Sequence, residues 1–134
     1  MSASSQPVDS PDVTRLDAMV IGAGVAGLYQ LYKLREMGLD VRGYEAGSGV
    51  GGTWYWNRYP GARFDSQVEV YQYWFSEELY KAWRPTERFP AQPETEQWLN
   101  FVADRLDLKK GHRIQRAHRL GALSRGRRPL GRAD

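Results

Sequence analysis

The sequence predicts an α/β fold that opens with a β-α-β unit. The first sign of this unit is the motif Gly22-x-Gly24-x-x-Gly27, which directly follows a short apolar run. Its second sign is another apolar run, which ends at Glu45. Strand, glycine turn, helix, strand and acidic residue in this order form the fingerprint of a Rossmann-like dinucleotide-binding fold. We therefore expect the N-terminal portion of such a domain, followed by further helices and incomplete by itself.

The glycines define the first turn and the helix behind it. A strand is expected at residues 17–21, whose apolar end is typical of a buried parallel strand. Gly22 allows a sharp bend, Gly24 lets backbone N–H groups approach a pyrophosphate, and Gly27 lets the helix pack on the strand. The helix is expected to end before Gly38, a residue that readily adopts the left-handed conformation of a helix end.

A second strand is expected at residues 41–45. Glu45 lies 23 positions after Gly22, near the spacing of a carboxylate that binds ribose hydroxyls. The Glu45 carboxylate would repel a 2′-phosphate, so a nucleotide that carries this phosphate is disfavoured at this site.

The middle of the chain is interpreted as scaffold. Ser76 can cap a short helix, which Pro85 prevents from extending. Pro93 suits the start of a second helix. Its apolar stripe comprises Trp98, Leu99, Val102 and Leu106.

Length and composition limit the class of protein. The 134 residues suit one modest domain, and the absence of cysteine excludes disulfides, thiolate metal sites and a cysteine nucleophile. No apolar stretch reaches the roughly 20 residues of a membrane helix. Residues 1–14, rich in Ser, Pro and Asp, have the pattern of a disordered leader rather than a secretory signal. We expect a cytoplasmic protein with no metal and no membrane partner.

A second glycine-rich loop, residues 47–52, precedes a cluster of aromatic residues. The cluster comprises Trp54, Tyr55, Trp56 and Tyr59. The glycine fingerprint alone does not distinguish NAD from FAD, because both cofactors share it. Large aromatic faces can line a flavin and cover it from water, so this cluster suits FAD. From the residues alone, the aromatic side chains could equally form core and the glycines a surface loop.

Residues 20–108 closely resemble the N-terminal part of Baeyer–Villiger monooxygenases of the cyclohexanone and phenylacetone monooxygenase type. The stretch Trp54-Tyr55-Trp56-Asn57-Arg58-Tyr59-Pro60-Gly61-Ala62-Arg63 carries most of this resemblance. Further matches are Gly22-x-Gly24-x-x-Gly27, Glu45, Gly51-Gly52-Thr53, Phe64-Asp65, Tyr71-x-Tyr73, Phe75-Ser76-Glu77-Glu78 and Gln92-Pro93-Glu94. The long stretch is far more specific than a glycine triplet and separates this family from generic flavin monooxygenases.

The resemblance implies FAD as bound cofactor, NADPH as hydride donor, and a ketone substrate oxidised by O₂ to an ester or lactone. It implies that Glu45 binds the adenosine ribose. Gly52 belongs to the second glycine-rich loop, which the glycines themselves predict to lie near the phosphates. The residues that it places along the flavin are Thr53, Trp54, Tyr55 and Trp56. It also implies that Tyr71 contacts the cofactor and that Arg63 to Asp65 border the nicotinamide site.

Asp65 is the catalytic residue that the resemblance implies, placed near the flavin to orient an active-site arginine. A carboxylate can hold such a cation beside developing negative charge. From the residues alone, Asp65 could instead cap a turn, and Tyr71 and Tyr73 could pack in the core. Phe64 stands where the family usually has a smaller residue.

Residues 111–134 differ abruptly from the rest of the chain. They hold seven Arg and one Asp, a balance of +6, whereas residues 1–110 hold 12 Lys/Arg and 15 Asp/Glu, a balance of −3. All 17 aromatic residues precede residue 111, and the tail shows no period of 2 or 3.6. The sequence therefore divides into a leader (1–14), part of an FAD-binding domain (15–110) and a basic tail (111–134).

A one-base insertion near codon 111, which shifts the frame and truncates the product, is the expected origin of this tail. One codon assignment of residues 111–134, read one base later, begins Asp-Ile-Glu-Phe and alternates like a strand, as expected at this place in the family. The alternative is an arginine-rich tail that binds nucleic acid or an acidic partner. We do not expect nucleic-acid binding.

The chain alone is expected to lack monooxygenase activity. It carries one glycine fingerprint, whereas the family has a second for NADPH, and the arginine that Asp65 would orient is not identifiable. A sheet of only two parallel strands should bury little apolar surface. A dinucleotide-binding module without redox activity is the alternative.

Overall fold

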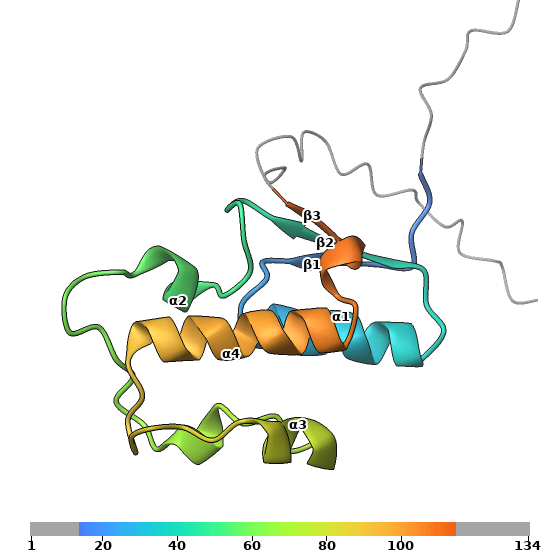
Figure 1. Ribbon diagram of the computed structural model, residues 1–134. Helices are drawn as coiled ribbons and strands as arrows, with labels where there is room; N and C mark the ends of the chain where they lie inside the picture. The colour runs from blue at the N-terminus through green and yellow to red at the C-terminus, as the bar shows by residue number, and fades with distance from the viewer. Residues whose placement is uncertain (1–13, 115–134) are drawn as a thin grey trace, which may run out of the picture.

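The structure is a computed structural model that describes residues 14–114 (Figure 1). Its sheet consists of β1 (Ala18–Ile21), β2 (Val41–Glu45) and β3 (His112–Ile114), all parallel and in the order β1-β2-β3. The first two strands lie where the sequence predicts them. The predicted leader lies outside the described residues, apart from residue 14.

The β-α-β unit is formed as predicted. α1 (Val25–Glu36) connects β1 to β2 and lies against both strands. The turn before it uses the positive φ of Gly22, 94°. A Cβ built on Gly27 would lie 2.0 Å from the carbonyl oxygen of Gly22. Only glycine therefore lets the helix approach the strand this closely.

The third strand departs from the sequence prediction of a two-stranded sheet. The chain leaves α4 (Gln92–Arg105), passes through a short 3-10 helix (Lys109–Gly111) and enters β3 beside β2. A strand of three residues is too short to show a period of two, so it could not be predicted from the pattern of residues. β3 lies within the predicted basic tail, of which residues 115–134 are outside the described part.

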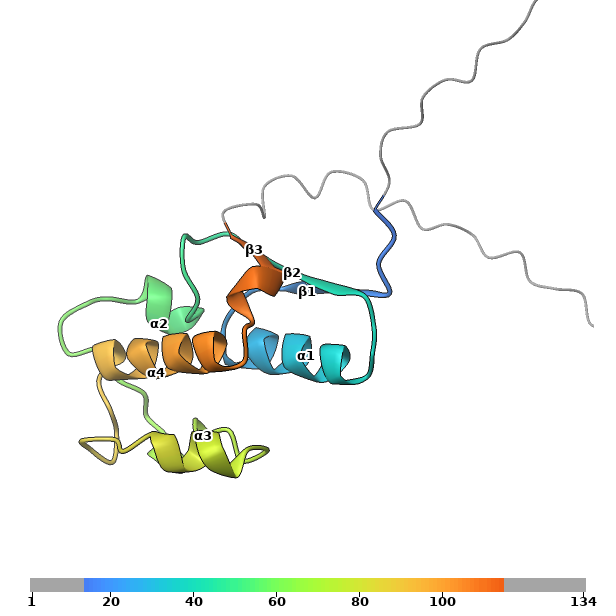
Figure 2. The same ribbon diagram turned by 45° about the vertical axis from the view of Figure 1, so that its right-hand side comes forward.

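Two further α-helices and a second 3-10 helix (Val68–Val70) complete the described chain. The two α-helices are α2 (Thr53–Trp56) and α3 (Glu77–Ala82). Ser76 caps α3 as predicted, since its Oγ accepts a hydrogen bond from the N–H of Leu79 at 3.3 Å. Pro93 lies in the first turn of α4, also as predicted. In both views α1 and α4 lie on the same side of the sheet, with α3 farther from it (Figures 1 and 2).

One hydrophobic core joins the sheet to these helices. The apolar stripe predicted for α4 belongs to it: Trp98, Leu99 and Val102 are buried, and Leu106 packs against them. Other members are Val20, Leu28, Leu31, Val50, Trp54, Leu79, Trp83 and Leu108. This core fixes the start of α1 and the loop after β2 relative to the sheet. Within residues 14–114, none of the helices combines the length and apolarity that a bilayer crossing requires.

Candidate nucleotide-binding site

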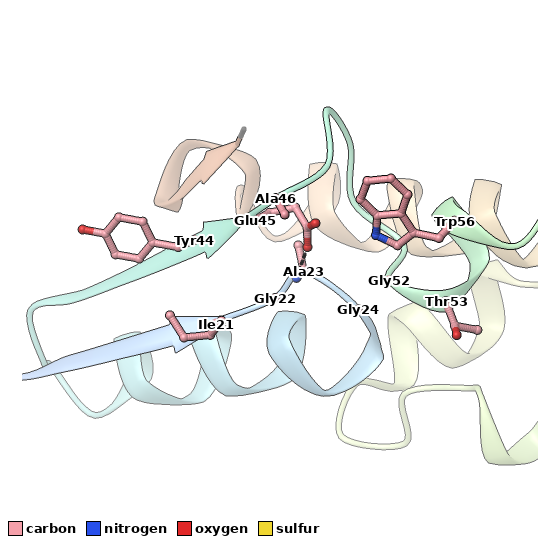
Figure 3. Close-up of a pocket in the computed structure, with 10 residues that line it drawn as sticks. All are labelled: Ile21, Gly22, Ala23, Gly24, Tyr44, Glu45, Ala46, Gly52, Thr53 and Trp56. Carbon is pink, nitrogen blue, oxygen red and sulfur yellow. Dashed lines mark hydrogen bonds between the residues drawn. The ribbon is translucent and has the colours of Figure 1, made fainter. Parts of the chain in front are cut away.

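A hollow of ≈ 370 Å³ lies at the carboxyl ends of β1 and β2 (Figure 3). Its lining consists of Ile21, Gly22, Ala23, Gly24, Tyr44, Glu45, Ala46, Gly52, Thr53 and Trp56. Open α/β sheets bind their ligands outside the carboxyl ends of the strands. The volume falls at the lower end of the range for small-molecule sites.

The amino end of α1 points into this hollow. Gly24 is its N-cap, no side chain caps the helix, and its first turn holds no acidic residue. The first N–H groups of a helix have no partner within the helix and carry its positive dipole end. The hollow therefore offers backbone donors to an anion such as a diphosphate.

The two glycine loops meet at the hollow. A Cβ built on Gly52 would lie 2.7 Å from the Cα of Gly24. The N–H of Gly51 donates to the carbonyl of Ala23 at 2.9 Å. Gly52 has a φ of 56°, which also favours glycine. The loop predicted to be near the phosphates is thus held against the fingerprint turn.

Glu45 binds both loops through its carboxylate. Oε2 accepts a hydrogen bond from the N–H of Ala23 at 2.7 Å (Figure 3). Oε1 accepts one from the N–H of Gly47, also at 2.7 Å. The side chain is 5% exposed. An ionised carboxylate has about four acceptor positions, so these two bonds leave capacity for ribose hydroxyls.

The aromatic cluster divides between the hollow and the core. Thr53 and Trp56 line the hollow, and Trp56 is 60% exposed. Trp54 is buried instead, with its ring edge-on to Phe64 and Tyr71 at centroid distances of 5.6 and 5.8 Å. The large Phe64 fits its position because it stacks on Tyr71 at 4.3 Å.

Tyr55 contacts the second glycine loop. Its Oη lies 2.5 Å from Oγ of Ser48 and accepts the N–H of Ser48 at 3.1 Å. These hydrogen bonds lower the pKa of Tyr55. The ring also packs over Gly47 and Gly49, where a Cβ would lie 2.6 and 3.1 Å from it.

Besides Gly27, Trp54 and Tyr55, three more predicted site residues lie outside the lining of the hollow. Arg63 forms an ion pair with Glu87 at 2.7 Å. Asp65 is exposed on the loop that follows, and Tyr71 packs against Trp54. The structure thus gathers Gly22, Gly24, Glu45, Gly52, Thr53 and Trp56 at the hollow, packs Gly27 behind it, and holds Trp54, Tyr55, Arg63, Asp65 and Tyr71 elsewhere.

Four lining residues were not predicted from the sequence. They are Ile21, Ala23, Tyr44 and Ala46. Each stands at the end of a strand or directly after it, so the rule that ligands bind at the carboxyl ends of strands would have found them. Among the residues 14–114, no group of three or more potential metal ligands is brought together.

Comparison with known proteins identifies the unit. A family model described as an NAD(P)-binding Rossmann-like domain matches residues 20–84. An acetone monooxygenase (methyl acetate-forming) of Gordonia sp. strain TY-5 is 67% identical over 97 residues, which cover 72% of this chain and 18% of the relative. A Baeyer–Villiger monooxygenase of Pseudooceanicola batsensis is 53% identical over 99 residues, with coverages of 73% and 18%.

Comparison with solved structures gives the same result. The crystal structure of OTEMO in complex with FAD and NADP has a TM-score of 0.70 and 46% identity, covering 75% of this chain and 19% of that one. The chain therefore spans about a fifth of the length of the relatives it matches. The resemblance that the motifs predict is confirmed: about three quarters of the chain match a Rossmann-like segment of the Baeyer–Villiger monooxygenases.

Proposed function

We propose that this chain binds the adenosine diphosphate half of FAD, as part of an FAD- and NADPH-dependent monooxygenase that inserts one oxygen atom of O₂ into ketones. The products of that reaction are esters or lactones. One observation carries the proposal: the fingerprint turn, the amino end of α1, the second glycine loop and the Glu45 carboxylate meet at one hollow. The complex of a relative with FAD and NADP supports it.

Each part of the hollow has a role in this proposal. The backbone N–H groups around Gly24 and Gly52 bind the diphosphate, and Glu45 accepts hydrogen bonds from the ribose hydroxyls. Trp56 presents an exposed ring beside them. FAD, when bound, supplies the redox chemistry. Asp65 is proposed to orient an arginine near the flavin, and Arg63 and Tyr71 to lie close to the cofactors.

We expect no monooxygenase turnover from the chain alone. The reaction needs FAD and NADPH together, whereas the structure offers one hollow with a dinucleotide fingerprint in its described part. Weak binding of FAD without turnover is the expected behaviour.

Quenching of tryptophan fluorescence by FAD tests the binding, with ADP, NAD and NADP as competitors. ADP should compete with FAD, and NADP should compete poorly because its 2′-phosphate meets Glu45. Glu45→Gln keeps the shape but removes the charge and turns one of the two acceptor oxygens into a donor NH₂ group. One loop N–H and the ribose hydroxyls then lose an acceptor, so FAD should bind at least about tenfold more weakly. Glu69→Gln, at an exposed position outside the hollow, is the matched control and should have no effect.

Other outcomes would favour the two alternatives. Tighter binding of NAD than of FAD would indicate a dinucleotide-binding module without flavin chemistry. Salt-sensitive binding of an oligonucleotide, lost when residues 111–134 are removed, would indicate that the arginine-rich tail acts by itself.

A further inference from the structure

The second glycine loop, residues 47–52, wraps around the ring of Tyr55. A Cβ built on Gly47 would lie 2.6 Å from Cε1 of that ring, and a Cβ on Gly49 would lie 3.1 Å from Cε2, on its other edge. A Cβ on Gly51 would lie 3.2 Å from the Cβ of Tyr55. The tyrosine therefore fills the space that side chains at three loop positions would need, and the loop takes its shape around it.

The hydroxyl of Tyr55 adds two polar contacts to this packing, both with Ser48 of the loop. Oη accepts a hydrogen bond from the N–H of Ser48 at 3.1 Å and lies 2.5 Å from its Oγ. A backbone N–H that belongs to no helix or strand is thereby paired. The ring and the hydroxyl together hold the loop from its inner side.

Tyr55 is itself anchored to α4 through Arg58. Nε of Arg58 donates to the carbonyl oxygen of Tyr55 at 2.8 Å, and the guanidinium lies over the tyrosine ring, 5.2 Å from its centre. Nη2 of Arg58 forms an ion pair with Oε1 of Glu96 at 2.5 Å. Gln92, on the same helix, donates to Oε2 of Glu96 at 2.8 Å and to the carbonyl oxygen of Trp54. A helix of the core thus sets the position of Tyr55.

Both ends of the loop contact the lining of the hollow, whereas Tyr55 is not part of that lining. The N–H of Gly47 donates to the Glu45 carboxylate, and the N–H of Gly51 donates to the carbonyl oxygen of Ala23. A loop that moved would therefore displace both the carboxylate and the fingerprint turn. Tyr55 can influence the hollow only through the loop that it supports.

We infer that Tyr55 is a positioning residue for the phosphate side of the hollow, which acts by holding the second glycine loop, with Ser48 as its partner. This inference rests on the proposed function. It differs from the role that the family resemblance implies for Tyr55, which is contact with the flavin. The loop contacts both edges of the ring and Arg58 lies over a face of it, so the ring is already engaged within the chain.

Amide hydrogen exchange of the full chain tests the loop without any ligand. Tyr55→Phe keeps the ring and removes the hydroxyl. The amides of Gly47 and Gly51 should then exchange about tenfold faster, because the hydroxyl no longer holds the loop between them. Tyr59→Phe, at a tyrosine that is 63% exposed, is the matched control and should leave both rates unchanged.

Competition with tryptophan quenching tests the site, with FAD, ADP and adenosine as ligands. Tyr55→Phe should weaken the binding of FAD and of ADP by the same factor, about fivefold, because both carry the diphosphate. Loss of a flavin contact would instead weaken FAD alone, since ADP has no flavin. Adenosine has no phosphate and should bind equally to both proteins, whereas general damage to the fold would weaken it too.

Ser48→Ala tests the partner. It should weaken FAD and ADP by a smaller factor, because the N–H of Ser48 remains, and it should have no further effect in Tyr55→Phe. The Ser48 hydroxyl is the largest influence that lowers the pKa of Tyr55; the N–H of Ser48 and the charge of Arg58 act in the same direction, and desolvation and the charge of Glu96 oppose them. Ser48→Ala should therefore raise this pKa, which the ¹³C signal of Cζ of Tyr55 reports.

Three results would overturn the inference. They are unchanged exchange of Gly47 and Gly51 in Tyr55→Phe, weaker binding of FAD with unchanged binding of ADP, and full additivity of Ser48→Ala and Tyr55→Phe. Failure of the unmodified chain to bind FAD or ADP would contradict the proposed function. The exchange rates and the pKa would then still decide whether Tyr55 holds the loop.

Discussion

The imidazole of His112 lies directly against the backbone of Gly43 on the neighbouring strand. A Cβ on Gly43 would lie 2.2 Å from Cδ2 of His112, so the glycine provides the space that the ring occupies. His112 is buried, and its Nδ1 lies 3.2 Å from the carbonyl oxygen of Leu108. Its Nε2 has no hydrogen-bond partner within the described residues. The ring is thus buried with one nitrogen near a carbonyl acceptor and the other nitrogen unpaired.

Acid should therefore destabilise the fold. Burial is the largest influence on His112 and lowers its pKa from 6.5; Arg35 acts in the same direction, whereas the backbone of Leu108 and Gly22 and the charge of Glu45 oppose it. The unfolded chain then binds the proton more readily than the folded one. The stability is fully present above about pH 6.5 and decreases as the pH falls below that value. Urea unfolding between pH 5 and 7 measures this slope.

Replacing the buried ring with a hydrocarbon should remove that slope. His112→Ile should also raise the free energy of unfolding at pH 7 by about 1 kcal/mol, because no polar atom is left buried and unpaired. His118→Ala, at the other histidine, is the control and should preserve the pH dependence. An unchanged slope in His112→Ile would assign the acid sensitivity to other groups.

A carboxylate beside Arg35 should stabilise the turn into β3. A Cβ on Gly111 would lie 2.0 Å from Nη2 of Arg35, which is the movable end of a long side chain. Gly111→Asp should therefore form an ion pair and raise the free energy of unfolding by less than about 1 kcal/mol. Gly111→Asn is the uncharged control. The gain should vanish when Arg35 is replaced by Gln, in a double-mutant cycle.

Residues 111 and 112 also bear on the proposed shift of the reading frame, which remains a prediction. One codon assignment of the alternative frame gives Asp-Ile in place of Gly111 and His112. Aspartate at residue 111 would meet the guanidinium of Arg35, and isoleucine at residue 112 would replace a buried ring whose Nε2 is unpaired. Sequencing of the gene across codon 111 is the direct measurement, and an uninterrupted frame in an independent isolate would contradict the insertion.

Adding one methyl group at Gly27 should weaken the fold. At an unconstrained helix position, Gly→Ala is stabilising by about 1 kcal/mol. Here the new Cβ would meet the carbonyl oxygen of Gly22, which is backbone and cannot move away alone. We expect Gly27→Ala to lose about 1–3 kcal/mol in urea unfolding and to bind FAD less tightly. Gln30→Ala, on the exposed side of the same helix, should show no loss.

The hydroxyl of Tyr73 should hold the first turn of α1 in place. Its Oη donates to the carbonyl oxygen of Val25 at 2.7 Å, and burial raises the pKa of Tyr73, so it remains a neutral donor. Tyr73→Phe should cost about 1 kcal/mol in the free energy of unfolding. Tyr59→Phe, with an exposed hydroxyl, is the matched change. If both variants were equally stable, the bond to Val25 would contribute nothing.

The local features of the fold could be predicted because single residues determine them. Gly22, Gly27 and Gly38 have conformations or contacts that other residues do not tolerate, and their spacing defines the unit. β3 could not be predicted, because three residues show no periodicity and His112 is polar. Its position depends on pairing with β2, which only the folded chain displays.

In the candidate site, too, features that follow from sequence spacing could be predicted, and features that depend on tertiary contacts could not. The fingerprint placed Gly24 and Glu45 at the hollow, since their roles follow from spacing. It did not predict that Glu45 would bind the N–H groups of two loops, because that geometry depends on how the loops fold back. Asp65 was expected from family resemblance, and the arginine that it would orient is not identified, so its role stays a prediction.

The contact between Gly24 and Gly52 couples two parts of the chain that are far apart in sequence. With their backbones this close, neither loop can rearrange without displacing the other. A ligand that orders one loop therefore orders both, and the entropic penalty of doing so is incurred once. Substitutions that disorder either loop should consequently have effects on affinity that overlap, rather than accumulate, when they are combined.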